Sequence, residues 1–191
     1  MIANLAADVR AFSSNAFLVT GERAVLVDAG ANFDVVGAVR ERTDALDALV
    51  LTHTHPDHVE NVPAIREAFG VEVWGCDPEH PQVDRAIEDG GSVTLGDHEY
   101  VALYTPGHKD DHLCFYAEKP KILFAGDLIF QNGGFGRTDP PEGNRELLVE
   151  SIEYVAETVS RDLEQLHCGH GPSVEGEAYR HIELARQAAR F

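Results

Sequence analysis

The chain has few cysteines, few lysines and no long apolar run. Cys76, Cys114 and Cys168 are odd in number and far apart, so we expect no disulfide framework and a reducing cytoplasm as the simplest compartment. The apolar stretches are shorter than a membrane span. Residues 1–10 lack the basic region and long apolar run of a secretory signal. These absences predict a cytoplasmic protein with no membrane partner.

Positive charge is also scarce, with 15 Lys and Arg against 33 Asp and Glu and a formal net charge of −18. A surface this acidic repels a phosphate backbone, so nucleic acid is not expected as a partner. The net charge also resembles that of proteins from high-salt cytoplasm, where salt screens the repulsion between like charges. We therefore offer a halophilic source as a hypothesis. With 191 residues, 43% of them hydrophobic, the chain suits one domain, residues 1–191.

Four side chains that can bind metals stand together in His53-Thr54-His55-Pro56-Asp57-His58, directly after the apolar segment 47–52. Histidine and aspartate ligands suit zinc, and also iron or manganese. One loop cannot aim all four groups at a single ion. It can divide them between two neighbouring ions, an arrangement that activates a bridging water for hydrolysis.

Three more ligand-type residues follow apolar segments, and each stands next to a glycine: His108, Asp127 and His170. Glycine permits the tight turns that aim a side chain into a site at the ends of strands. The resulting inventory assigns His53, His55 and His108 to one ion, Asp57, His58 and His170 to the other, and Asp127 to both as a bridge.

Five sequence elements occur in the order of a known family: Leu26-Val-Asp28-Ala-Gly30, the segment 53–58, Thr105-Pro-Gly-His108, Ala125-Gly-Asp127 and Cys168-Gly-His170-Gly171. Through them the chain resembles the metallo-β-lactamase fold superfamily over roughly residues 15–172. The resemblance implies an α/β fold, an αββα four-layer sandwich of two mixed sheets with outer helices and a dinuclear metal centre at one edge. It also implies that Asp28 supports the metal loop and orients its ligands.

Hydrophobic periodicity and turn residues predict the elements along the chain. A hairpin is expected over 16–27 and a buried strand over 49–52. A second sheet is expected from strands 71–75, 92–95, 99–104, 112–117 and 121–125, with a last strand at 163–168. Helices are expected over 35–42, 58–69, 145–160 and 175–190.

The glycine-rich segment 130–143 follows Asp127 and is the candidate substrate loop. Gly136-Arg-Thr-Asp139 resembles an element of short glyoxalase II-like hydrolases and of persulfide dioxygenases. Phe135, Gly136 and Arg137 are therefore candidate substrate contacts, with Arg137 offering a planar cation to a carboxylate. The alternative is a structural pair of Arg137 with Asp139. His112 is a spare ligand, a proton carrier or, as we expect, a surface residue where a strand begins.

These features predict a metal-dependent hydrolase of a small thioester, similar to glyoxalase II (hydroxyacylglutathione hydrolase). A hydroxide bridging two Zn²⁺ ions would attack the thioester carbonyl, with Asp57 and Asp127 as catalytic residues that orient it. The thiolate leaves without a strong general acid.

Other functions stay open at this stage. A persulfide dioxygenase would bind one Fe²⁺ through His53, His108 and Asp127. A lactonase, phosphoesterase or nuclease of the same fold would use the same centre, with zinc, iron or manganese in mixed occupancy. A metal-bound protein without catalysis and a homodimeric assembly are likewise left open.

Overall fold

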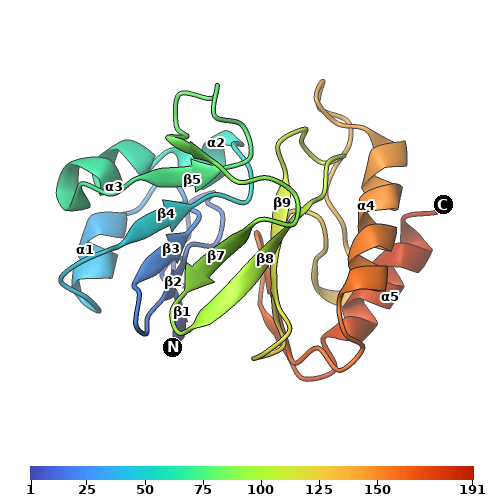
Figure 1. Cartoon of the computed structure of the whole chain (residues 1–191). Helices are drawn as coiled ribbons and strands as arrows, with labels where there is room; N and C mark the ends of the chain where they lie inside the picture. The colour runs from blue at the N-terminus through green and yellow to red at the C-terminus, as the bar shows by residue number, and fades with distance from the viewer.

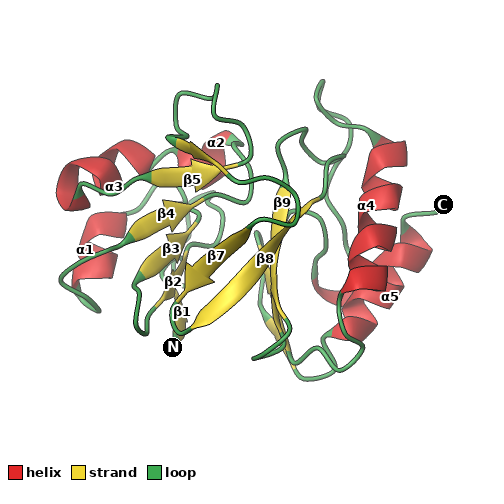
Figure 2. Cartoon of the chain, in the orientation of Figure 1, coloured by secondary structure: helices red, strands yellow, loops and turns green.

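The computed structural model describes residues 1–191 as two six-stranded sheets packed face to face, with helices outside them (Figures 1 and 2). The first sheet has the order β1 (Ile2–Asn4), β2 (Phe17–Val19), β3 (Val25–Val27), β4 (Ala48–Val50), β5 (Val73–Gly75) and β6 (Arg85–Ala86). The second has the order β12 (Val174–Glu175), β11 (Gln165–Cys168), β10 (Ile122–Gly126), β9 (Leu113–Ala117), β8 (His98–Tyr104) and β7 (Ser92–Leu95).

Helices cover the outer face of each sheet (Figure 1). The first sheet carries α1 (Val35–Arg40), α2 (Pro56–Val59) and α3 (Val62–Phe69), and the second carries α4 (Arg145–Thr158) and α5 (Tyr179–Ala188). A 3₁₀ turn, η1 (Gln131–Gly133), packs against α5. Both sheets mix parallel and antiparallel pairs. The predicted αββα sandwich of two mixed sheets is therefore confirmed.

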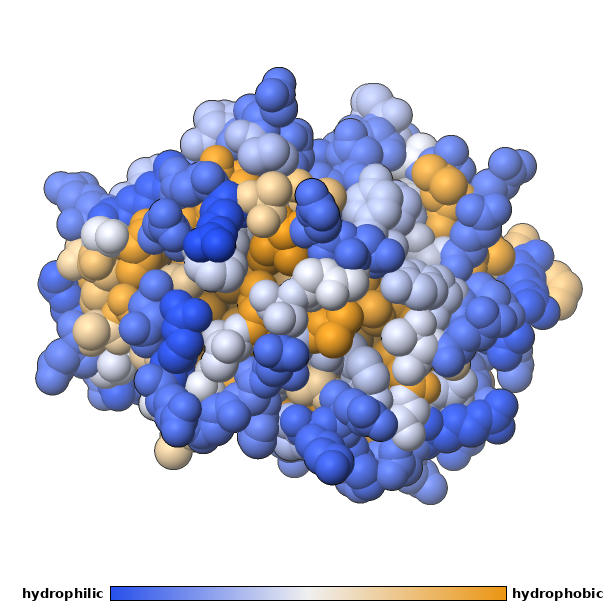
Figure 3. Space-filling model, in the orientation of Figure 1, coloured by the Kyte–Doolittle hydropathy of each residue, from blue (hydrophilic) through white to orange (hydrophobic).

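Three apolar cores hold the four layers together: one lies between the sheets, and one lies between each sheet and its helices. Strands β9 and β10 are buried along their whole length, because both faces of the second sheet are covered. On the face shown in Figure 3, hydrophilic residues make up most of the surface. No helix has both the length and the apolar character needed to span a bilayer.

Three expectations about the elements were wrong. Residues 71–75 were assigned to the second sheet, but they form β5, which pairs in parallel with β4 in the first sheet. A helical connection that leaves a strand usually brings the chain back to a neighbouring parallel strand of the same sheet. The helix predicted over 58–69 is two helices, since the chain turns at Glu60 and Asn61 and Pro63 fits only a first helical turn. The last helix begins at Tyr179, because residues 174–175 pair with β11 as a strand.

Strands from both sheets end at one edge of the sandwich, and this determines where the ligand-type residues lie. Strand β4 leads into the segment 53–58, β8 into Thr105–His108 and the parallel neighbours β10 and β11 into Asp127 and His170. The pairing of Gly126 with Cys168 across a bulge brings the ends of β10 and β11 together. Segments far apart in sequence therefore meet at this edge.

Candidate metal centre

The loop after β4 is held from outside by Asp28, a buried residue at the end of β3 with a φ of 58°. Its Oδ1 accepts a hydrogen bond from the Thr52 amide at 2.8 Å, and its Oδ2 accepts one from the Thr52 hydroxyl at 2.8 Å. The same Oδ2 lies 2.9 Å from Nδ1 of His58. Asp28 thus contacts the segment 52–58 at both ends.

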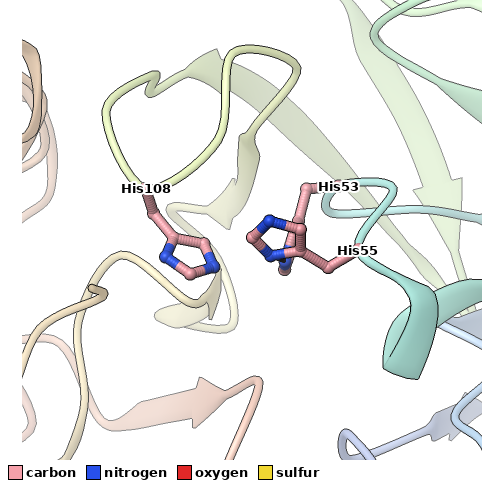
Figure 4. Close-up of side chains that lie close together, drawn as sticks. All are labelled: His53, His55 and His108. Atoms are coloured by element: carbon pink, nitrogen blue, oxygen red, sulfur yellow. Dashed lines mark hydrogen bonds between the residues drawn. The ribbon is translucent and has the colours of Figure 1, made fainter. Parts of the chain in front are cut away.

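A first cluster consists of His53, His55 and His108, which come from two loops and point toward one another (Figure 4). One ligand atom from each lies within 4.8 Å of the others. His53 Nδ1 is 3.1 Å from the Thr52 hydroxyl, which already donates to Asp28 and therefore accepts here. His108 Nδ1 donates to a backbone carbonyl at 2.8 Å. The inner Nε2 atoms of His53 and His108 therefore carry no proton, and each presents a lone pair to the cluster.

Electrostatics keep two imidazoles of the first cluster neutral. Burial and the neighbouring imidazole of His58 lower the pKa of His53 well below its ordinary value. Burial also lowers the pKa of His108. Neutral imidazoles are the form that binds metals. The first cluster is consequently ready to accept a cation near neutral pH.

A second cluster consists of Asp57, His58 and His170, with ligand atoms again within 4.8 Å of one another. His170 Nε2 lies 3.0 Å from Asp57 Oδ2, and His58 Nε2 lies 3.9 Å from the same oxygen. Burial would lower the pKa of His58, but Asp28 and Asp127 raise it to about 10. This cluster differs from the first in having a carboxylate, that of Asp57, among its three members.

Asp127 lies between the two clusters. Its Oδ1 is 3.6 Å from His58 Nε2, and its Oδ2 is 3.4 Å from both His108 Nε2 and His170 Nε2. Burial opposes ionisation, yet the surrounding histidines hold the pKa of this carboxyl below its usual range. Its two oxygens thus face ligands of both clusters, in the position expected of a bridge.

The buried polar atoms test whether these residues fit metal ions. Three of the four buried side-chain nitrogen and oxygen atoms without a hydrogen-bond partner belong to this site: His58 Nε2, His108 Nε2 and Asp127 Oδ1. Buried polar atoms nearly always have a partner, so these converging unpaired atoms fit a bound cation, which would take the place of the proton on His58. The nitrogen and oxygen donors suit zinc, iron or manganese alike.

A cavity of about 370 Å³ opens over the two clusters. Phe135, Gly136 and Arg137 line it, as do Phe12, Phe130, Pro140 and five of the ligand-type residues. Arg137 Nε also donates to Asp139 Oδ1 at 2.8 Å, with both side chains exposed. The structure therefore places Arg137 both beside the cavity and in the predicted pair with Asp139.

The expectation for His112 was wrong, because its side chain is fully buried beneath the site. Its Nδ1 lies 2.8 Å from the Thr105 hydroxyl, and its Nε2 accepts the backbone N–H of Asp127 at 3.0 Å. Burial lowers its pKa to about 3. The chain before β9 turns inward under the metal loop, so the start of this strand is interior rather than exposed. His112 is thus a backbone support for Asp127.

Three further contacts were not anticipated. Asp111 accepts a hydrogen bond from the Thr54 hydroxyl at 2.5 Å, Glu142 Oε1 lies 3.1 Å from His55 Nε2, and Phe12 stacks on His170 with ring centroids 5.7 Å apart. None of these side chains lies in a recognisable motif. Only Glu142 lies in a segment singled out from the sequence, the candidate substrate loop 130–143.

Comparisons with known proteins agree with this geometry. The family model described as the metallo-beta-lactamase superfamily matches residues 9–176. The chain is 31% identical to the hydroxyacylglutathione hydrolase GloC of Haemophilus influenzae, over 85% of this chain and 88% of the relative. It is 34% identical to a hydroxyacylglutathione hydrolase of Klebsiella pneumoniae, over 75% of this chain but only 57% of that longer enzyme.

Solved structures are similar along almost the whole chain. TTHA1623 in a di-iron-bound form has a TM-score of 0.76 and 27% identity, covering 98% of this chain and 96% of that one. ETHE1 from Myxococcus xanthus has a TM-score of 0.74 and 26% identity, covering 93% and 85%. At the level of the family, these matches and the two ligand clusters support a metal-dependent hydrolase. The chain belongs to the metallo-β-lactamase superfamily.

Proposed function

We propose that this protein hydrolyses a small thioester with the help of two metal ions, most simply Zn²⁺, as glyoxalase II-like enzymes do. The observation that carries the proposal is the pair of three-residue clusters joined by Asp127 at the floor of one cavity. The names of the hydroxyacylglutathione hydrolase relatives supply the substrate class.

In this proposal His53, His55 and His108 would hold one ion, Asp57, His58 and His170 would hold the other, and Asp127 would serve both. Two bound divalent cations would supply Lewis acidity for the carbonyl and would lower the pKa of water for attack.

The protein's own groups orient the reactants. Burial would raise the pKa of Asp57, but a hydrogen bond from His170 together with the charges of His58 and His170 lowers it, so this carboxylate stays ionised and can accept a hydrogen bond at the cavity floor. The rings of Phe12, Phe130 and Phe135 form an apolar wall that excludes water beside the thioester. The leaving thiolate is stable near neutral pH, so the site needs no strong acid for it.

The test combines metal analysis with turnover on one sample. We expect about two zinc ions per chain by mass spectrometry and hydrolysis of S-lactoylglutathione. Two bound metals without hydrolysis of any small thioester would contradict the proposal. Lactone and phosphate-ester substrates, assayed on the same sample, would then decide between the other hydrolytic activities.

A persulfide dioxygenase is the second candidate, favoured by the resemblance of Gly136-Arg-Thr-Asp139 to an element of those enzymes. It would use one Fe²⁺ at His53, His108 and Asp127. The cluster of Asp57, His58 and His170 favours the two-metal hydrolase, because a mononuclear site leaves those ligands without a role. One iron per chain, no hydrolysis and oxygen consumption with a persulfide would establish the dioxygenase instead.

A further inference from the structure

The substrate loop reaches the first cluster at two of its three histidines. The backbone carbonyl of Arg137 accepts a hydrogen bond from His108 Nδ1 at 2.8 Å. Five residues later, Glu142 Oε1 lies 3.1 Å from His55 Nε2. The same loop therefore lines the cavity with Phe135 and also supports two histidines of the proposed metal centre from outside.

The contact with Glu142 determines which nitrogen of His55 can face an ion. An ionised carboxylate only accepts hydrogen bonds, so Nε2 of His55 carries the proton in this pair. Nδ1 is then the lone-pair atom, and it lies 3.1 Å from Nε2 of His53. Nε2 of His53 also carries a lone pair, because Nδ1 of His53 donates the ring's proton to the Thr52 hydroxyl. Two lone pairs this close repel unless a proton or a metal ion lies between or beside them.

The position of Glu142 agrees with this role. Its side chain is about one-third exposed, whereas that of His55 is 15% exposed, so the carboxylate covers the open side of the imidazole. The loop's other acidic side chain, Asp139, pairs instead with Arg137 and contacts no histidine. The two acids of one loop thus have different partners, which provides a matched control.

We propose that Glu142 is a positioning residue for the first metal ion: by accepting the Nε2–H of His55, it fixes the tautomer and ring orientation that present Nδ1 to the ion. Carboxylate partners of this kind orient metal-binding imidazoles and raise their basicity. The cavity wall and the first ion are consequently coupled through residues 137–142. This inference rests on the metal centre of the proposed function, not on its substrate.

The test measures metal retention in the full-length protein. Wild type, Glu142→Ala, Glu142→Gln and Asp139→Ala would each be loaded with Zn²⁺ and equilibrated with graded concentrations of a chelator, and the zinc remaining per chain would be counted. Loss of an outer partner weakens metal binding by about 10- to 100-fold. We expect Glu142→Ala to release one zinc at chelator concentrations lower by about that factor and to keep the other as wild type does.

Two comparisons assign the effect to the carboxylate. Glu142→Gln should lose less affinity than Glu142→Ala, because an amide oxygen can still accept the hydrogen bond. Asp139→Ala should behave like wild type. The His170→Ala variant damages the second cluster and should keep one zinc ion. Adding Glu142→Ala to it should lower the affinity for that remaining ion.

Either of two results would overturn the inference: Glu142→Ala holding both ions as tightly as wild type, or Asp139→Ala losing as much as Glu142→Ala. Thioester turnover of the same wild-type sample separates this from the proposed function. A protein that shows the Glu142 effect on zinc but hydrolyses no thioester would refute the function and leave the positioning role intact.

Discussion

Replacing Gly169 by alanine should remove the bridging position of Asp127 while the fold remains. A Cβ at this glycine would lie 2.0 Å from Asp127 Oδ1 and 2.9 Å from His58 Cε1. Its φ lies outside the left-handed region, so the backbone itself accommodates an L side chain. The conflict is therefore with side chains of the proposed centre, above all Asp127, and not with the conformation of residue 169 itself.

The size of the effect follows from that distance. Since Cβ contacts shorter than 3.0 Å are essentially never found, the Asp127 carboxylate must move by at least about 1 Å. A displacement of about 1 Å at a reacting centre costs about 100-fold in rate, which corresponds to about 2.7 kcal/mol. The glycine-to-alanine change also restricts the unfolded chain, which stabilises the fold by about 0.4–1 kcal/mol and offsets part of the strain.

Three measurements check this reasoning: zinc per chain after dialysis, thioester turnover and urea unfolding with a chelator present. We expect Gly169→Ala to lose bound metal and about 100-fold or more in turnover, with little change in unfolding free energy. Gly171→Ala is the control, because its φ is +75° and a Cβ there meets nothing within 4 Å. It should lose about 1–2 kcal/mol of stability and keep both metals. Wild-type metal content and turnover in Gly169→Ala would refute the bridging role of Asp127.

Three further predictions concern other parts of the molecule. Asp57→Ala should lose most thioester turnover, about 100-fold or more, while its urea unfolding stays cooperative; retained turnover would remove Asp57 from the mechanism. Phe12 is 74% exposed and stacks on His170, so Phe12→Ala should leave stability nearly unchanged. It should raise KM about 2- to 10-fold for thioesters with bulky acyl groups, because an aromatic contact of about 0.5–1.5 kcal/mol is lost. An unchanged KM would show that the ring does not touch the substrate. Burial lowers the pKa of His167 from 6.5 to about 4. Between these values the unfolded chain binds a proton at His167 that the folded protein does not. The contribution of His167 to the free energy of unfolding therefore falls by about 3 kcal/mol as the pH drops from 6.5 to 4. His167→Asn should show a shallower fall in urea unfolding with a chelator present, and parallel curves for both proteins would contradict this.

The fold could be predicted because its strongest signals are local. Apolar runs bounded by turn residues located most of the long strands, and helical periodicity located α4. The pattern does not say which sheet a strand joins, and for this reason residues 71–75 were assigned to the wrong one. Strands β1, β6 and β12 were not predicted, because each is short and none lies in a run of buried apolar residues.

The ligand-type residues were predictable for a different reason. Each one directly follows a strand or stands in the dense motif 53–58, and the sandwich brings those strand ends to one edge. Their outer partners were mostly not predictable. Glu142 and Phe12 reach the site through the path of long loops, and His112 looks like a strand-initiating surface residue until the chain before β9 is seen to turn inward. Tertiary packing decides these contacts, and local sequence carries no trace of it.

The outer partners also explain how the two clusters differ. Hydroxyl and carbonyl oxygens support His53 and His108, whereas carboxylates support His55, through Glu142, and His58. Each cluster therefore contains one imidazole whose outer nitrogen faces a carboxylate. The carboxylate behind His58 is Asp28, which also holds Thr52 and, through it, His53. Because Asp28 connects to both clusters and Glu142 only to the first, an ion bound at the first cluster would depend on the loop 130–143 as well as on Asp28, whereas an ion at the second would not depend on that loop's carboxylates.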